Sequence, residues 1–390
     1  MTQLFWLSFG LLAYMYVGYP LLVGALARVF GRKPAAADIT PRATLFIPAY
    51  NEAAHIEAKL RNSLALDYPR DRLAIVVASD GSTDGTDAIV ARYAGQGVRL
   101  LRMPQNAGKA AMLDAFVPQV TGEVLIFSDA SSELAPEAVR RLVQPFADAS
   151  VGCVSGLYRL KAAGTTDLRG EGEGLYWTYE TWIKRQESRL HSILGAHGAL
   201  YAIRQALFEP LGDTSINDDY LIPMRIVGRG FRAVYEPAAV AWEREVASVE
   251  GEFARRRRIA MGNCQQIVAL RQLLSPRAGW VALSFFSHKV LRTLAPVFLV
   301  TLLAASVALP QPWQAATLGA QALLYGSAWV GYVCQQRGHA PRWLSPPLYF
   351  CLGNLAMGDG LLRYLAGQRT AWNPPASADT LSVTGRSGVG

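Results

Sequence analysis

The sequence is poor in cysteine, and long stretches of it contain no charged residue. Its 390 residues include four cysteines, which are scattered without the close spacing of a metal site: Cys153, Cys264, Cys334 and Cys351. This scarcity predicts no disulfide framework and suits a reducing compartment. Lysine and arginine number 38 against 30 acidic residues, and much of the excess lies beside apolar segments. That placement favours a membrane surface and a phosphate-bearing ligand over nucleic acid.

The first apolar stretch, residues 4–26, carries no charge and has the roughly 20 residues that a membrane-spanning helix needs. A signal peptide is the alternative, but no basic residue precedes the stretch and no small-residue cleavage site is evident before Arg28. Arg28, Arg32 and Lys33 follow it. The positive-inside rule therefore places the N-terminus outside and the middle of the chain in the cytoplasm.

Apolar stretches return near the other end of the chain. Residues 296–309 and 313–333 predict two spanning helices joined by a tight external hairpin. Residues 345–366 are also apolar, but Asp359 and Arg363 interrupt them. A spanning helix and a re-entrant segment both stay open for this stretch.

The middle of the chain has the composition of a globular domain in which apolar strands alternate with helices. The predicted strands are residues 44–49, 73–79, 98–103 and 123–128. This alternation predicts a parallel sheet covered by helices on both faces. Ligands bind such sheets at the C-terminal ends of the strands.

Acidic side chains follow three of these strands: Glu52, Asp80 and Asp129. Capping of the next helix is a competing explanation, and it suits Asp84 best. Asp80 and Asp129 follow directly from buried strands, so we favour ligand binding for both.

Four motifs stand in order on these strand ends: FIPAYNE (46–52), SDGSTDGT (79–86), GKA (108–110) and FSDA (127–130). Together they resemble the family 2 inverting glycosyltransferases, and in particular the membrane branch that includes cellulose, chitin-oligosaccharide and hyaluronan synthases. The resemblance implies a GT-A α/β fold, Rossmann-like with a mainly parallel sheet, between an N-terminal transmembrane helix and a C-terminal helical membrane region. The expected units are a transmembrane helix, the GT-A domain, interfacial helices, a membrane region and a disordered tail, at residues 1–30, 40–250, 251–292, 293–370 and 371–390 respectively.

The resemblance also implies a donor site. The nucleoside pocket would be lined by three residues, Ala49, Tyr50 and Glu52. Asp80 would contact the base, Lys109 would lie near the base or the phosphates, and Asp129 would open the Asp-x-Asp motif that places the ribose and the metal-bound diphosphate. That motif lacks its second carboxylate, because Ser131 stands in its place and a hydroxyl is a weaker ligand for a hard cation. Mg²⁺ or Mn²⁺ is expected to bind through Asp129, Ser131, the diphosphate and water, with help from Glu133.

The triplet Asn217-Asp218-Asp219 precedes a predicted helix and resembles the family's Thr-Glu-Asp triplet. An inverting transfer is a single displacement, so the attacking hydroxyl must lose its proton as it bonds. The resemblance assigns that proton to Asp219. Favourable charge at a helix N-terminus is the competing explanation, and it applies in part to Asp218.

The segment GAHGAL, residues 195–200, resembles the loop that approaches the acceptor. We therefore assign Gly198, His197 and Asp218 to the acceptor side. For His197 a direct role and a purely structural role stay open.

Arg255 to Arg258 form the densest charge in the chain, where the family carries Gln-x-x-Arg-Trp. Arg258 keeps the family's arginine and is assigned to the leaving diphosphate, because a guanidinium binds phosphate oxygens bidentately. Arg255 replaces the glutamine on the donor side. Arg256 and Arg257 are expected to face anionic lipid. Ile259 replaces a tryptophan that stacks on sugar in the synthases, which weakens the case for a long exported polymer.

Two further segments suggest contact with a membrane interface. Trp177 and Trp182, with charged residues between them, predict an amphipathic interfacial helix, although a core helix explains the spacing equally well. Ser287, His288 and Lys289 resemble the family's interface helix and are expected to seat the catalytic domain against the bilayer.

The predicted function is inverting transfer of a sugar from a UDP-sugar to a membrane-associated or lipid-linked saccharide in envelope or exopolysaccharide synthesis. The alternatives are a processive synthase that secretes its polymer and a non-catalytic membrane scaffold. The expected location is a bacterial-type inner membrane, multi-pass, with the catalytic domain in the cytoplasm. The expected partners are the nucleotide-sugar, the saccharide acceptor and membrane lipids, without nucleic acid, and self-association into a homo-oligomer is left open.

Overall fold

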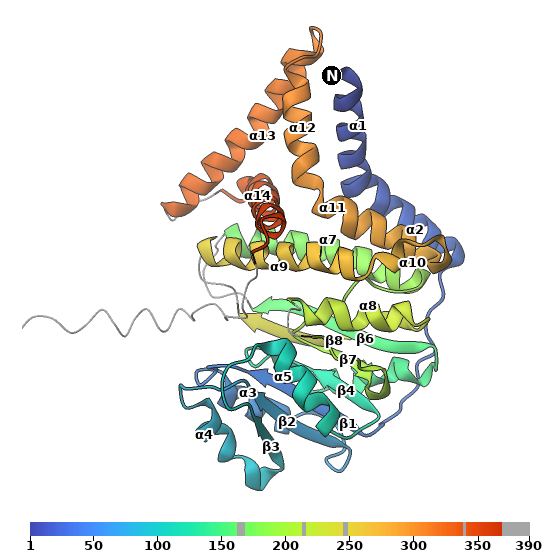
Figure 1. Ribbon diagram of the computed structural model, residues 1–390, viewed down its shortest axis with the longest axis vertical. Helices are drawn as coiled ribbons and strands as arrows, with labels where there is room; N and C mark the ends of the chain where they lie inside the picture. Colours follow the sequence, from blue (N-terminus) through green and yellow to red (C-terminus); the bar gives the residue numbers. More distant parts are fainter. Residues whose placement is uncertain (162–167, 213–215, 245–248, 338–340, 369–390) are drawn as a thin grey trace, which may run out of the picture.

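The computed structural model describes the chain except residues 162–167, 213–215, 245–248, 338–340 and 369–390. An α/β domain forms one end, a layer of long helices covers it, and a helical projection rises from that layer (Figure 1). The predicted disordered tail, residues 371–390, lies outside the described residues.

The described strands form one eight-stranded sheet in the order β3-β2-β1-β4-β7-β6-β8-β5. The strands of its first half are β1 (Ala43–Ala49), β2 (Leu73–Ser79), β3 (Val98–Arg102) and β4 (Val124–Phe127). They pair in parallel, and they agree with the four predicted strands to within one residue at each end.

The second half of the sheet corrects the expectation of a mainly parallel sheet. Its strands are β5 (Glu133–Leu134), β6 (Val151–Lys161), β7 (Tyr201–Arg204) and β8 (Arg232–Arg244). β7 runs antiparallel to both β4 and β6, and β5 runs antiparallel to β8, so the whole sheet is mixed. β6 and β8 pair in parallel, so the antiparallel pairs are confined to β7 with its two neighbours and to the short strand β5 at the edge.

Helices and alternating apolar residues cover both faces of the sheet. The domain's helices are α3 (Ile56–Leu64), α4 (Thr86–Ala91), α5 (Lys109–Phe116), α6 (Ala138–Val143) and α8 (Asp218–Gly228). Along β1, Phe46 faces one core and its neighbours Leu45 and Ile47 face the other, as the two-residue period of a strand requires. The first helix of the domain, α3, begins at Ile56, because the chain bends at residues 50–51 and turns at residues 53–55.

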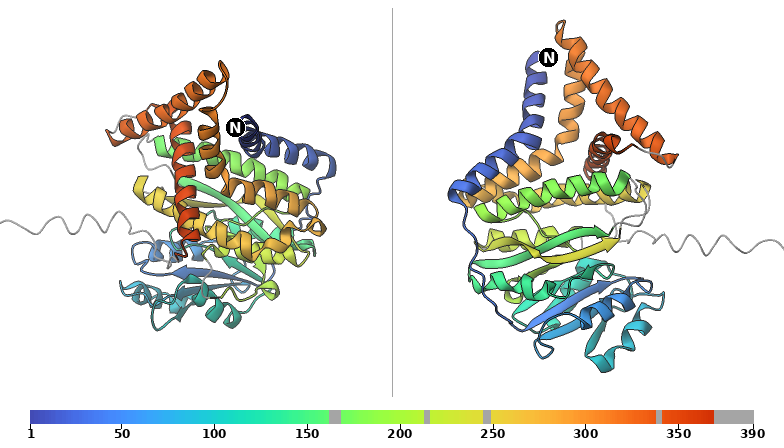
Figure 2. Two further views of the ribbon diagram at one scale, coloured as in Figure 1. Left: turned by 45° about the horizontal axis from the view of Figure 1, so that its top comes forward. Right: turned by 180° about the vertical axis from the view of Figure 1, so that it is seen from behind.

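A layer of helices lies above the sheet. α7 (Leu168–Leu190) and α9 (Val249–Ala269) run side by side over α8, and α14 (Ser345–Leu365) crosses above α9 (Figures 1 and 2). α14 approaches α9 closely, since a side chain at Gly360 would come within 2.5 Å of the Ala260 Cβ.

The projection consists of the N-terminal helical segment and two further helices (Figure 1). The segment joins α1 (Thr2–Ala13), a π-helical turn η1 (Tyr14–Gly18) and α2 (Tyr19–Phe30). α12 (Ala295–Ser306) rises beside it and α13 (Trp313–Gln336) descends again.

By length and composition, Thr2–Phe30 is the one helix of the described chain able to cross a membrane. A second crossing is added if Trp280–Thr293 and Ala295–Ser306, bent by 58°, count as one. The predicted N-terminal span thus corresponds to a continuous apolar helix. The other two predicted segments, 313–333 and 345–366, correspond to α13 and α14, which do not meet that criterion.

Candidate active site

The turns after β1 and β2 are joined by hydrogen bonds. The Asn51 amide donates to Ser82 Oγ, the Glu52 amide to Thr86 Oγ1 and the Ala53 amide to Asp84 Oδ2. Asn51 has a left-handed backbone (φ 53°), and its side-chain oxygen accepts from the Thr83 amide. Asp84 also accepts from the Thr86 amide, so the predicted capping residue joins two turns as well.

Asp80 is fully buried at the end of β2. Its two carboxylate oxygens accept from the Ala107 and Gly108 amides at 2.9 and 2.8 Å. These bonds fix the loop that precedes Lys109 at the start of α5. Because both oxygens are used in this way, contact of Asp80 with a nucleobase stays a prediction.

The three residues predicted for the nucleoside pocket lie at the C-terminal end of β1. Ala49 is buried, while Tyr50 and Glu52 are half-buried. Burial raises the pKa of Glu52 to about 7, and the nearby charges of Asp129 and Asp84 add to the effect.

Lys109 lies between two of the predicted carboxylates. Its Nζ is 3.1 Å from Asp218 Oδ1 and 3.5 Å from Asp129 Oδ1. Burial disfavours the charged amine, but Asp218 and Asp129 outweigh it and raise the pKa of Lys109. A permanent cation therefore stands at the centre of the acidic groups.

Asp219 and Asp129 both approach residues 195–200, the predicted acceptor loop. The Gly198 amide donates to Asp219 Oδ2 at 3.2 Å. A Cβ at Gly198 would lie 3.0 Å from Asp129 Oδ2 and 3.5 Å from Asp219 Oδ2, so both carboxylates lie against the loop at this glycine. Burial, with the charge of Asp218, raises the pKa of Asp219 to about 6. The residues predicted from separate motifs thus meet at the ends of β1 and β4.

Two residues predicted for the acceptor side point into the protein. Asp218 is buried, and its second oxygen accepts from the Tyr201 hydroxyl at 3.4 Å. His197 is buried among three rings, those of Tyr158, Trp177 and Tyr235. Burial lowers the pKa of His197 well below its ordinary value, which makes it a neutral ring. Of its two open roles, this environment favours the structural one.

Residues 44–212 match the family described as Glycosyl transferase family 2. The chain contains a family 2 glycosyltransferase domain. It is 30% identical over 243 residues to a probable glycosyltransferase, YdaM, of Bacillus subtilis, which covers 60% of this chain and 57% of the relative. It is 26% identical over 238 residues to a poly-beta-1,6-N-acetyl-D-glucosamine synthase of Staphylococcus aureus, covering 60% and 56%. The chain thus spans just over half the length of these relatives.

A solved structure extends the likeness beyond the glycosyltransferase domain. The mannosyltransferase PcManGT from Pyrobaculum calidifontis, in complex with GDP-Man and Mn²⁺, matches with a TM-score of 0.73 at 27% identity. The match covers 94% of this chain and all of that one. The helical layer and the projection therefore belong to the shared architecture.

Next to the glycosyltransferase domain, the arginine run of α9 corrects one expectation. Arg256 pairs with Glu252 and lies over the Tyr349 ring of α14, and Arg257 pairs with Asp359 of the same helix. Both expected lipid-facing arginines thus hold α14 on α9, because that helix covers the face from which they project.

The two arginines assigned to the donor differ in their surroundings. Arg255 pairs with Glu252 at 2.9 Å, while Arg258 is half-buried one residue before Ile259. The Ile259 carbonyl accepts from Asn217 Nδ2 at 3.3 Å, so this part of α9 touches the triplet that holds Asp219. A diphosphate contact stays a prediction for both arginines.

Sequence reasoning missed Lys59 in this glycosyltransferase domain. Its side chain is 2% exposed, and Nζ donates to Ser128 Oγ at 2.6 Å and to Ser132 O at 2.9 Å. Both serine hydroxyls also donate to the Ala199 carbonyl. Burial lowers the pKa of Lys59 to about 7. The lysine thus holds the two serines that join the Asp129 loop to the acceptor loop. The signal in the sequence was a single lysine on the apolar face of a predicted helix.

Glu243 was also missed. The antiparallel register of β5 and β8 pairs Glu133 with Trp242, and Glu243 follows next to the Asp129 loop. Burial raises the pKa of Glu243 to about 7, with Asp129 contributing. No sequence signal identifies Glu243, because only the folded sheet brings it to this loop.

A divalent cation would find few protein ligands here. Among the described residues, no group of three or more His, Cys, Asp or Glu has the arrangement of a metal site. Asp129 is partly exposed and Ser131 is exposed, which suits a cation that takes its remaining ligands from a diphosphate and water.

Proposed function

We propose that this glycosyltransferase transfers a sugar, with inversion, from a nucleotide-sugar to a membrane-associated or lipid-linked saccharide. The observation that carries the proposal is the position of Lys109 between Asp129 and Asp218, with Asp219 beside them. A fixed cation next to a partly ionised carboxylate suits a diphosphate leaving group and a hydroxyl that must lose its proton.

In the proposed reaction, an acceptor hydroxyl attacks the anomeric carbon while Asp219 takes its proton. The bond from that carbon to the diphosphate breaks, and Lys109 and Arg258 stabilise the charge on the departing oxygens. Asp129 and Ser131 would hold a divalent cation, which neutralises the diphosphate when it is bound. The pKa of about 6 keeps Asp219 mostly ionised, yet basic enough to accept a proton, near neutral pH.

The sequence predicts a UDP-sugar donor, and a GDP-sugar is a second candidate. The solved mannosyltransferase, which is similar over nearly the whole chain, carries GDP-Man. The synthase relative is named for a polymer of N-acetylglucosamine. Donors of both nucleotide classes therefore belong in the test.

We also propose that the projection lies in a bacterial-type inner membrane, with the glycosyltransferase domain in the cytoplasm. Thr2–Phe30 is long and apolar enough to cross. Large apolar side chains are exposed on all three helices of the projection, among them Leu7, Val300 and Trp329. Such a surface is costly in water and favourable in lipid.

A processive synthase is the second candidate, favoured by the name of the Staphylococcus aureus relative. Ile259 counts against it, because an aliphatic side chain cannot stack on a sugar ring as tryptophan does. The two functions share their chemistry and differ in the length of the product.

The deciding experiment incubates the full chain in membranes with radiolabelled UDP- and GDP-sugars and separates the products by size. We expect one donor to label a small lipid-extractable product in the wild type and none in Asp219→Asn. A labelled polymer retained at the origin would support the processive alternative instead. Equal labelling by both proteins would refute Asp219 as the base, and donor binding without turnover in the wild type would favour a scaffold.

A further inference from the structure

Three consecutive residues near the base of the projection reach three different parts of the molecule. They lie in a π-helical turn, η8 (Phe285–Val290), between α10 (Trp280–Ser284) and α11 (Leu291–Thr293). Single π-helical turns inside a helix often mark functional positions, because they change the direction of successive side chains.

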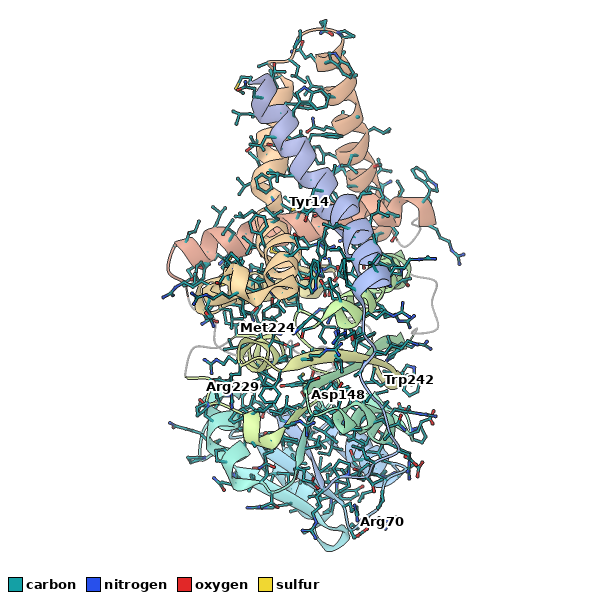
Figure 3. The ribbon with its side chains drawn as sticks, turned by 90° about the vertical axis from the view of Figure 1, so that its right-hand side faces the viewer. Tyr14, Arg70, Asp148, Met224, Arg229 and Trp242 are labelled. Atoms are coloured by element: carbon teal, nitrogen blue, oxygen red, sulfur yellow. The ribbon has the colours of Figure 1, made fainter. Side chains whose placement is uncertain are left out.

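The first two residues connect the N-terminal segment and α7. Ser287 Oγ is 2.8 Å from the hydroxyl of Tyr14, a residue that Figure 3 labels on the N-terminal segment. His288 Nδ1 is 2.7 Å from Glu187 Oε1, which also accepts from the Tyr19 hydroxyl. The turn is therefore fixed to the helix that we propose for the membrane.

The third residue, Lys289, points toward the glycosyltransferase domain. Its Nζ lies 3.4 Å from the ring centroid of Tyr220 and donates to Asn263 Oδ1 at 2.6 Å. In the described part of the chain, no carboxylate lies within ion-pair distance of Lys289. Burial lowers the pKa of Lys289 to about 7, so the amine is partly charged near neutral pH. Its charged form rests on an aromatic face, an attraction that strengthens when water is excluded.

Tyr220 directly follows Asp219, and its ring also packs on the acceptor loop. A side chain at Gly195 would overlap the Tyr220 ring, so the ring packs directly on that backbone. The next residue of the loop, Ala196, donates its amide to the Asp219 carbonyl at 2.8 Å. The ring is therefore held between Lys289 and the loop that also bonds the Asp219 carboxylate through Gly198.

We propose that Lys289 is a positioning residue for Asp219. The amine of Lys289 holds the Tyr220 ring against the acceptor loop. Because the π-helical turn that carries Lys289 is also bonded to the N-terminal segment, the position of that segment affects the orientation of the Asp219 carboxylate. The kinetic part of this proposal rests on the proposed function. The mechanical part concerns only how firmly residues 195–198 and 217–221 are held.

The Tyr220 hydroxyl offers a way to separate the ring from its polar group. It is buried and has no hydrogen-bond partner among the described residues. Tyr220→Phe keeps the ring and should behave like the wild type. Tyr220→Leu removes the aromatic ring on which the charged amine of Lys289 rests. It should therefore have the same effect as replacing Lys289.

The main test replaces Lys289 by methionine, which keeps most of the apolar stem, in the full chain in membranes. We expect kcat to fall about tenfold while the KM for the donor changes less than about twofold, because a misplaced base affects chemistry and not donor binding. Lys289→Arg should restore most of the rate, since a guanidinium also binds an aromatic face. Lys33→Met, which removes an exposed charge near the N-terminal segment, should leave both constants unchanged.

Hydrogen exchange supplies a readout that needs no activity. Amides in 195–198 and 217–221 should exchange faster in Lys289→Met and Tyr220→Leu than in the wild type, Tyr220→Phe and Lys33→Met. Unchanged exchange in both variants would overturn the proposal, as would a loss confined to KM. If the wild type uses no nucleotide-sugar, the proposed function is refuted. The hydrogen-exchange result still decides whether Lys289 holds the Tyr220 ring against the acceptor loop. If Lys289→Met does not fold, Tyr220→Leu against Tyr220→Phe gives the same comparison.

Discussion

The proposed donor side of the site is held by bonds between neighbouring loops, whereas the proposed base, Asp219, is held by segments far apart in the chain. Residues 50–53 bond the turn at 82–86, and Asp80 bonds the loop at 107–108. Asp219 instead depends on the acceptor loop, on α9 through Asn217 and on Lys289 through Tyr220. The donor half can therefore hold its shape alone, while the base needs the helical layer above it.

The largest expected effect comes from the base itself. Asp219→Asn should lower kcat about 10³-fold with donor affinity retained, because an amide cannot accept the proton. In the wild type, kcat should fall below about pH 6, where Asp219 becomes protonated. Folding raises the pKa of Asp219, so at pH 7 its ionised carboxylate destabilises the folded protein. Asp219→Asn removes this charge and should therefore unfold at a higher temperature than the wild type. A flat pH profile between 5 and 7, measured as kcat at saturating donor, would contradict this assignment.

Lys109→Met should weaken donor binding on the order of 50-fold, the value of a lost charge-assisted hydrogen bond. It also leaves Asp129 and Asp218 without their shared cation. Titration of a nucleotide-sugar by intrinsic fluorescence or calorimetry measures the change. Arg102→Gln, whose exposed guanidinium pairs with the mostly buried Asp87, is the matched loss of one charge and should bind normally. Equal affinities for wild type and Lys109→Met would remove the lysine from the donor site.

Lys59→Met tests whether the donor half depends on its buried lysine. We expect donor affinity to fall about tenfold, because the Asp129 loop loses the three hydrogen bonds from Lys59 to Ser128 and Ser132. Arg61→Gln, on the exposed face of the same helix, should be neutral. A lower kcat with unchanged donor affinity would show that Lys59 supports the position of Asp219 instead. The donor side and the base would then not be held independently.

The smallest effect is expected on the base side, at Gly262. A side chain there would overlap Asn217, the first residue of the triplet. Gly262→Ala should lower kcat about fivefold by shifting Asp219, with donor affinity unchanged. Gly319→Ala in α13 meets nothing within 4 Å and serves as the control. If the two alanine variants behave alike, α9 does not set the position of the base.

The same division explains what the sequence could predict. The strands at 44–49, 73–79, 98–103 and 123–128 are continuous apolar runs followed by polar turns, so local pattern was enough to find them. The motifs on their ends supplied Glu52, Asp80 and Asp129, which the fold brings to one edge of the sheet.

Features that depend on distant partners escaped local reasoning. For the helix that carries Trp177 and Trp182, an interfacial and a core role stayed open, and its charged residues Glu180 and Lys184 are buried. Glu180 pairs with Arg292 and His288, more than 100 residues away. Arg256 and Arg257 were likewise assigned to lipid because the helix that covers them, α14, lies far along the chain.

The path of the last helices has a practical consequence for labelling the protein. α12 leaves the helical layer, α13 returns to it, and α14 then lies flat across α9 (Figure 1). The first residue, by contrast, lies at the far tip of the projection. If the projection crosses a bilayer, a fluorescent reporter joined after α14 would sit on the same side as the glycosyltransferase domain, and one joined before Thr2 would sit on the other.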